Sequence, residues 1–191
     1  MAEPLEDAVE SGDKKIALLI AILALFLALA EAGAKNAEHR ATELNIESSD
    51  LYNFYQAKKV RSTIAETAAE ALEAQRGATS DPQVQAAIDK QIADWKATVA
   101  KFEKDPKTPE DSLDAILERA KQAAEGRELR NRKLEHFEYA SGALQIAVVL
   151  ASAAIITGAA ALAWVAGLLG LAGAALLGFG HLAPMVLPFF G

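Results

Sequence analysis

The chain has 191 residues, a formal net charge of −7 and no cysteine. The acidic balance argues against a nucleic-acid-binding protein, which needs a basic surface, and the lack of cysteine excludes disulfides and thiolate metal sites. No Asp, Glu, Lys or Arg occurs from Tyr139 to Gly191. A soluble fold needs charge on the surface of every element, so this part is predicted to lie in a membrane. A buried hairpin of a larger soluble complex is the alternative.

The N-terminal part is predicted to be an acidic tail, residues 1–15, followed by a first transmembrane helix, residues 16–34. Residues 16–30 carry no polar side chain, but as a helix they cover only about 22 Å, so the span must extend past Glu31. The Glu31 carboxylate must then reach the interface or find a partner. A signal peptide would also fit the short apolar run, but the residues before it are acidic. We therefore expect the segment to be kept as an anchor.

Small side chains form a stripe on this first helix. They recur at spacings of four, three and four residues, which puts them on one face and lets helix backbones approach closely in lipid. The predicted packing residues are Ala17, Ala21, Ala24 and Ala28.

Residues 35–139 are predicted to form an extended, coiled-coil-like helical hairpin outside the membrane, with helices at about 35–76, 83–104 and 110–139. Residues 77–81 form a turn, and Asp81-Pro82 is a helix-start signal. A second break lies at residues 105–109. Nothing stops the first helix from continuing out of the first span, or the third from continuing into the second. The middle helix has the clearest apolar face: Val84, Ile88, Ile92, Trp95, Val99 and Phe102.

An aromatic cluster on the first hairpin helix covers more than one helix face. It is formed by Tyr52, Phe54 and Tyr55. Packing against Trp95 within the hairpin is one interpretation, and a contact to a second subunit or another partner is the other.

The last two spans are predicted at residues 140–157 and 162–181, with a turn at Thr157-Gly158 and an apolar tail over 182–191. The final span has a small-residue surface that favours close helix packing. Its members are Gly167, Gly170, Gly173, Ala174 and Gly178. The predicted fold class is therefore all-α, with three transmembrane helices and a helical hairpin outside the membrane.

The distribution of basic residues predicts an orientation. The hairpin side of the spans carries Lys35, Arg40, Arg127, Arg130, Arg132 and Lys133, whereas the opposite side carries only Lys14 and Lys15. By the positive-inside rule, the hairpin is expected in the cytoplasm.

Catalytic motifs are missing from the sequence. It has no phosphate-binding glycine loop, no nucleophile elbow and no zinc-protease motif. His39 and His136 flank the membrane near Glu38 and Glu135, so a metal site is conceivable, with a solvated charged collar as the alternative. We expect no catalytic residue, no cofactor and no metal, and hence a protein that is not an enzyme.

Two segments resemble one known family. Residues 49–58 read SDLYNFYQAK and residues 143–152 read ALQIAVVLAS. Both are similar to motifs of the bacterial DUF4337 membrane proteins, although Leu51 stands where that family usually has Trp. The resemblance implies a multi-pass protein of the bacterial inner membrane, and it supplies no activity.

The apolar helix faces exceed what one hairpin can bury. We therefore expect a membrane-anchored scaffold or interaction protein that self-associates. A pore-forming or transport accessory subunit built by oligomerisation is the alternative. The expected partners are the lipid bilayer, further copies of the chain and an unidentified membrane protein, with no nucleic acid.

Overall fold

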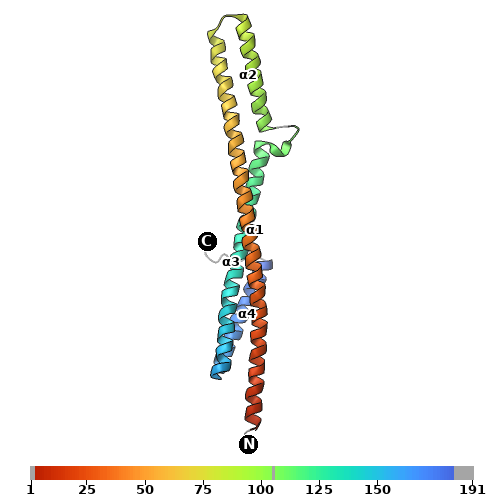
Figure 1. Cartoon of the computed structure of the whole chain (residues 1–191), viewed down its shortest axis with the longest axis vertical. Helices are drawn as coiled ribbons and strands as arrows, with labels where there is room; N and C mark the ends of the chain where they lie inside the picture. Colours follow the sequence, from red (N-terminus) through yellow and green to blue (C-terminus); the bar gives the residue numbers. More distant parts are fainter. Residues whose placement is uncertain (1–2, 105, 183–191) are drawn as a thin grey trace. The chain divides into compact units, whose positions relative to one another are not determined.

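All regular elements over residues 3–104 and 106–182, the ranges that the computed structural model describes, are helical. They are α1 (Glu3–Ala78), α2 (Pro82–Glu103), a short 3-10 helix η1 (Pro109–Asp111), α3 (Leu113–Thr157) and α4 (Ala160–Leu182) (Figure 1). Three helices, α1, α3 and α4, are long and apolar enough to cross a membrane. The predicted all-α class with three candidate spans is therefore confirmed.

The chain forms two compact units. The first, called the span unit here, comprises residues 1–42 and 127–191, and the second, the hairpin unit, comprises residues 43–126. The boundary falls inside the predicted hairpin of residues 35–139. The reason is packing, since Ala37 and Phe137 belong to the same buried cluster as the apolar segments.

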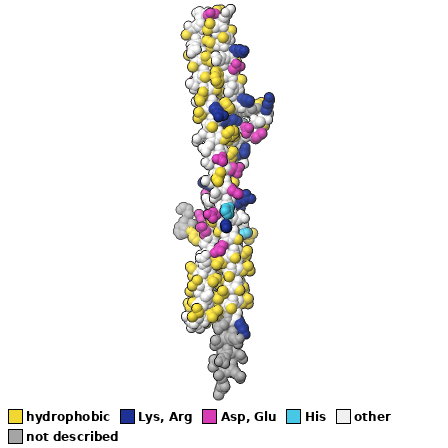
Figure 2. Space-filling model, viewed as in Figure 1, with side chains coloured by type: hydrophobic (Ala, Val, Ile, Leu, Met, Phe, Trp, Pro, Cys, Tyr) yellow, Lys and Arg dark blue, Asp and Glu magenta, His cyan; other side chains and the backbone are white. Residues whose placement is uncertain are grey.

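Small side chains dominate the core of the span unit. On α3 the buried residues recur every three or four positions, as expected for one helix face: Phe137, Ala140, Leu144, Ala147, Ala151 and Ala154. On α1 they recur every seven: Leu23, Ala30 and Ala37. On α4 they are Ala166, Gly170, Gly173, Leu177 and Gly180. The outer surface of these segments is mainly hydrophobic on the face seen in Figure 2.

The hairpin unit has a small core of its own. Ile116 of α3 is fully buried, and Ser62, Ala65 and Ala69 of α1 and Ile92 of α2 are also buried. A hydrogen bond ties α1 to α3, because Ser48 Oγ donates to the carbonyl oxygen of Ala120 at 3.1 Å. On the predicted apolar face of α2 only Ile92 is buried, and Val84 remains 44% exposed.

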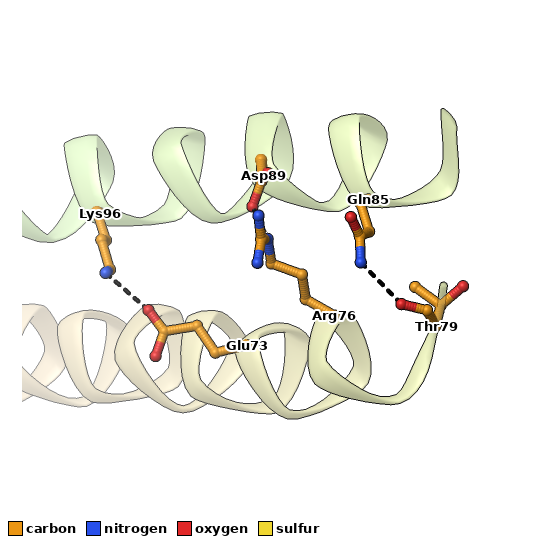
Figure 3. Close-up of polar contacts among 6 residues, drawn as sticks. All are labelled: Glu73, Arg76, Thr79, Gln85, Asp89 and Lys96. Carbon is orange, nitrogen blue, oxygen red and sulfur yellow. Dashed lines mark hydrogen bonds and ion pairs between the residues drawn. The ribbon is translucent and has the colours of Figure 1, made fainter. Parts of the chain in front are cut away.

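Polar contacts join α1 and α2 near their turn (Figure 3). Asp81 caps α2, since its side chain accepts a hydrogen bond from the Gln83 amide at 2.9 Å, and Pro82 occupies the first turn as predicted.

Two ion pairs link α1 and α2, one between Arg76 and Asp89 and one between Lys96 and Glu73, the latter at 2.7 Å. Gln85 Nε2 also donates to the Thr79 carbonyl oxygen at 2.8 Å.

Helix boundaries differ from the predicted ones at two places. Helix α1 begins at Glu3, inside the segment predicted to be an acidic tail. Helix α3 begins at Leu113 rather than near residue 110, because Thr108 makes no side-chain capping bond. Instead, Ser112 Oγ accepts a hydrogen bond from the Ala115 amide at 3.3 Å, which is the capping geometry of a helix start.

The turn between α3 and α4 is where the sequence predicts it. Helix α3 ends at Thr157, and Gly158 adopts a φ of 67° that glycine tolerates without a steric penalty. The predicted apolar tail lies outside the described residues from position 183 onward.

Candidate functional site

A groove of about 810 Å³ opens on the span unit between α1, α3 and α4. Its floor is the Phe137 ring of α3, which is only 4% exposed. Two glycines lie against this ring. A Cβ placed on Gly33 would come within 3.2 Å of Phe137 Cζ, and one placed on Gly180 within 2.9 Å of Cε1. His181 meets the same ring edge-on, with 5.2 Å between the centroids. Glycine at positions 33 and 180 therefore lets α1 and α4 approach the Phe137 ring closely.

The lining of the groove changes character along its length. Phe26 and Leu29 of α1 and Leu177 of α4 provide an apolar portion. Arg130 and Lys133 of α3 provide positive charge, and none of the described lining residues is Asp or Glu. Positions 130, 133 and 137 are three and four residues apart, so both cations share the helix face of Phe137. The groove thus has an apolar portion and a portion that carries two positive charges.

An acidic depression of about 440 Å³ also lies on the span unit. Glu31, Glu38 and Glu138 line it, together with Lys35 and Gln145. Gln145 Nε2 lies 3.4 Å from Glu31 Oε1 and donates a hydrogen bond to it. The expectation that Glu31 finds a partner is met, because its carboxylate accepts this hydrogen bond from α3.

The predicted alanine stripe of α1 is exposed and is not covered by the described residues. Ala17, Ala21, Ala24 and Ala28 are all exposed, and the face of α1 that packs inside the span unit carries Leu23 and Ala30 instead.

The predicted small residues of α4 have different surroundings. Gly170 packs against Leu23 of α1 and Gly173 against Leu144 of α3, whereas Ala174 and Gly178 line the groove. A Cβ on Gly167 or Gly178 would meet no heavy atom of the described residues within 4 Å. The sequence analysis missed Gly33 and Gly180, which contact Phe137 most closely. The spacing 166-170-173-177-180 of small or buried residues is the signal that would have placed Gly180 on the packed face.

The aromatic cluster is only partly buried. Tyr52 is 36% exposed and Phe54 is 46% exposed, with the Lys58 ammonium 5.7 Å from the Phe54 ring centroid. Tyr55 and Trp95 are half-buried.

Large apolar side chains that sequence analysis did not single out are exposed on α1 in the hairpin unit. Ile46 is 56% exposed, Val60 58% and Ile64 59%. Ile46 and Phe54 also line a shallow depression of about 560 Å³. An exposed apolar surface of this kind is typical of an interaction site.

The two membrane-flanking histidines differ in burial. His39 is exposed, whereas His136 is 2% exposed. Over residues 14–104 and 106–182, whose side chains the structure describes, no group of three His, Asp or Glu side chains is arranged to hold a metal ion. The metal-site hypothesis therefore has no ligand set among them.

Comparison with known proteins gives one result for the whole chain. The family model described as "Domain of unknown function (DUF4337)" matches residues 12–183. No curated protein and no solved structure matches the chain. The match covers the three candidate spans and the hairpin unit together, and the chain therefore belongs to the DUF4337 family.

Proposed function

We propose that this protein is a membrane-anchored helical scaffold that self-associates along α1. The observation that carries the proposal is the exposed surface that α1 presents within each unit. In the hairpin unit, Ile46 and Ile64 are eighteen residues apart, and eighteen residues are five full turns of an α-helix. Because α1 is uninterrupted from Glu3 to Ala78, this spacing puts both on the same face.

Val60 adds to this face of the hairpin unit, because it lies four residues before Ile64 and is also exposed. In the span unit, the exposed alanine stripe of α1 is a second surface. The buried residues Ser48 and Ser62 lie on the other side of the helix, where α1 packs within the hairpin unit. The exposed face is therefore separate from the contacts inside one chain.

A second copy of the chain fits both exposed surfaces of α1, the alanine stripe and the apolar face of the hairpin unit. In lipid, exposed alanines let two helices approach closely and gain van der Waals contact. In water, the half-exposed Ile46, Val60 and Ile64 would each contribute about 1 kcal/mol when covered. Anchoring two copies in one membrane raises their effective concentration, so a modest contact is sufficient. A symmetric pair uses the same patch on both subunits, as a stripe along one helix allows.

Single-cysteine cross-linking tests this proposal directly. The chain has no cysteine, so Val60→Cys introduces the only thiol. Lys59→Cys is the control, because Lys59 is exposed but lies about 100° around the helix from Val60 and about 140° from Ile64. Oxidation in native membranes should link Val60→Cys into a dimer and leave Lys59→Cys as a monomer.

Two other results would overturn self-association. One is equal cross-linking of both variants, which would reflect random collision. The other is a Val60→Cys product with a different protein, which would assign the face to another partner. Native mass spectrometry in mild detergent gives a second readout, and a monomer at every concentration would contradict the proposal.

A further inference from the structure

We propose that the groove on the span unit binds one anionic phospholipid, with the headgroup phosphate at Arg130 and Lys133. This inference does not depend on self-association, because the groove is formed by other faces of the span unit. The residues that carry it are the two cations, the apolar side chains and the glycines of the groove lining.

Charge selects an anionic ligand. Arg130 and Lys133 are both half-buried and face one groove, with Asn36 of α1 as an additional hydrogen-bonding side chain. An arginine guanidinium and a lysine ammonium are the usual partners of a phosphate oxygen. The depression lined by Glu31, Glu38 and Glu138 is acidic and repels the same ligand. The groove is therefore the site on the span unit whose lining suits a negative headgroup.

The apolar lining selects a lipid over a free phosphate. Phe26 and Leu29 belong to the apolar segment of α1, and Leu177 belongs to α4, both long and apolar enough to cross a membrane. A soluble anion would leave this portion empty, whereas an acyl chain fills it and the headgroup stays with the cations. Basic pockets between membrane helices are known to bind anionic lipid headgroups.

Glycine supplies the room for the chain. Gly178 lines the groove, and a Cβ at this position would meet no heavy atom of the described residues within 4 Å. A large side chain placed there would occupy the groove without disturbing the packed face of α4. This makes Gly178 a position where binding can be blocked while the fold is kept.

Native mass spectrometry of the full-length, delipidated protein in detergent provides the test. Phosphatidylglycerol and phosphatidylcholine with the same acyl chains are titrated, and binding is read from the monomer peak. The expected result is one tightly retained phosphatidylglycerol and at least about fivefold weaker phosphatidylcholine, which corresponds to about 1 kcal/mol. Equal binding of the two lipids would overturn the proposal.

Variants assign the binding to the groove. Lys133→Gln should weaken phosphatidylglycerol binding about fivefold, and Arg130→Gln combined with Lys133→Gln about 25-fold. Lys35→Gln, which removes one positive charge beside the acidic depression, is the charge-matched control for Lys133→Gln and should leave affinity unchanged. Equal losses in Lys133→Gln and Lys35→Gln would mean a non-specific surface attraction and would contradict a defined site.

Filling the groove gives an independent check. Gly178→Phe should abolish retention of the lipid, whereas Gly167→Phe should not, because Gly167 has the same open surroundings but does not line the groove. Glycerol phosphate in excess should fail to displace the lipid. Displacement by glycerol phosphate, or undiminished binding by Gly178→Phe, would show that an acyl chain in the groove is not the ligand.

Discussion

Gly173 of α4 packs directly on Leu144 of α3. A Cβ on Gly173 would lie 2.8 Å from Leu144 Cγ and 3.2 Å from the carbonyl oxygen of Ala140. Leu144 is fully buried, so neither it nor the backbone can move aside easily. Larger side chains at such contacts force backbone shifts, and here they would push α3 and α4 apart.

Gly173→Leu should therefore destabilise the span unit by about 2 to 3 kcal/mol. Gly167→Leu is the control, since a Cβ there meets no described heavy atom within 4 Å. Thermal unfolding in detergent, followed by circular dichroism, measures the difference. A Gly173→Leu protein as stable as the control would mean that α4 does not pack on α3 as described.

Two buried serines of α1 should respond in opposite directions to the same substitution. Ser48 Oγ donates a hydrogen bond to Ala120, whereas Ser62 Oγ is buried with no hydrogen-bond partner among the described residues. Ser48→Ala removes the hydrogen bond between α1 and α3, so it should cost about 1 kcal/mol. Ser62→Ala removes a buried, unpaired hydroxyl and should be neutral or stabilising by about 1 kcal/mol.

Hydrogen exchange of the hairpin-unit amides is the measurement for the serine pair. Protection should fall in Ser48→Ala and hold or rise in Ser62→Ala. A loss of protection in both variants would indicate that the Ser62 hydroxyl has a partner that stabilises the folded state.

The ion pair between Arg76 and Asp89 should leave hairpin stability independent of pH around neutrality. The hydrogen bond to Asp89, followed by the negative charge of that carboxylate, raises the pKa of the Arg76 guanidinium. Because the pKa of this base is raised on folding, the stabilising contribution of the ion pair is complete at every pH below the ordinary pKa of arginine. That contribution disappears only as pH rises through the raised pKa, which lies far above neutral pH.

Both partners are also exposed, with side chains 46% and 48% accessible, so the pair is screened by water and salt. Arg76→Ala should not change hairpin protection measurably between about pH 6 and pH 9. A clear loss in that window, measured by hydrogen exchange, would show that the turn depends on this ion pair.

A charge placed on the exposed face of α1 should disrupt self-association without unfolding the hairpin. Ile64 is 59% exposed, so Ile64→Glu buries no charge within one chain. In a dimer, two carboxylates would meet across the contact and lose their hydration. Thr63→Glu adds the same charge beside the face and should leave the dimer intact.

Analytical ultracentrifugation in detergent separates these outcomes. The association constant of the dimer should fall at least about tenfold in Ile64→Glu, which corresponds to about 1.4 kcal/mol. Equal dimer fractions in Ile64→Glu and Thr63→Glu would show that this face of α1 does not form the dimer contact.

Sequence patterns placed the helices well because local signals set their ends. Asp81-Pro82 starts α2, and Gly158 lies in the turn that follows Thr157. The start of α3 was misplaced because two candidate caps, Thr108 and Ser112, stand four residues apart, and only the folded chain shows that Ser112 accepts the bond.

The candidate sites were harder to predict, because they depend on which faces remain uncovered. The alanine stripe of α1 is visible in the sequence, but its exposure depends on α3 and α4 packing elsewhere. Likewise, Gly33 of α1 and Gly180 of α4 both contact Phe137 of the groove. No residue spacing along the chain predicts that these two helices pack on the same ring.

The short connection at Gly158 bears on how the protein enters the bilayer. Helices α3 and α4 are joined by only two residues outside the helices, and neither carries an ionisable group. No Asp, Glu, Lys or Arg side chain follows Glu138. The two helices can therefore insert together as a pair, with no carboxylate, ammonium or guanidinium group to carry across the hydrocarbon core.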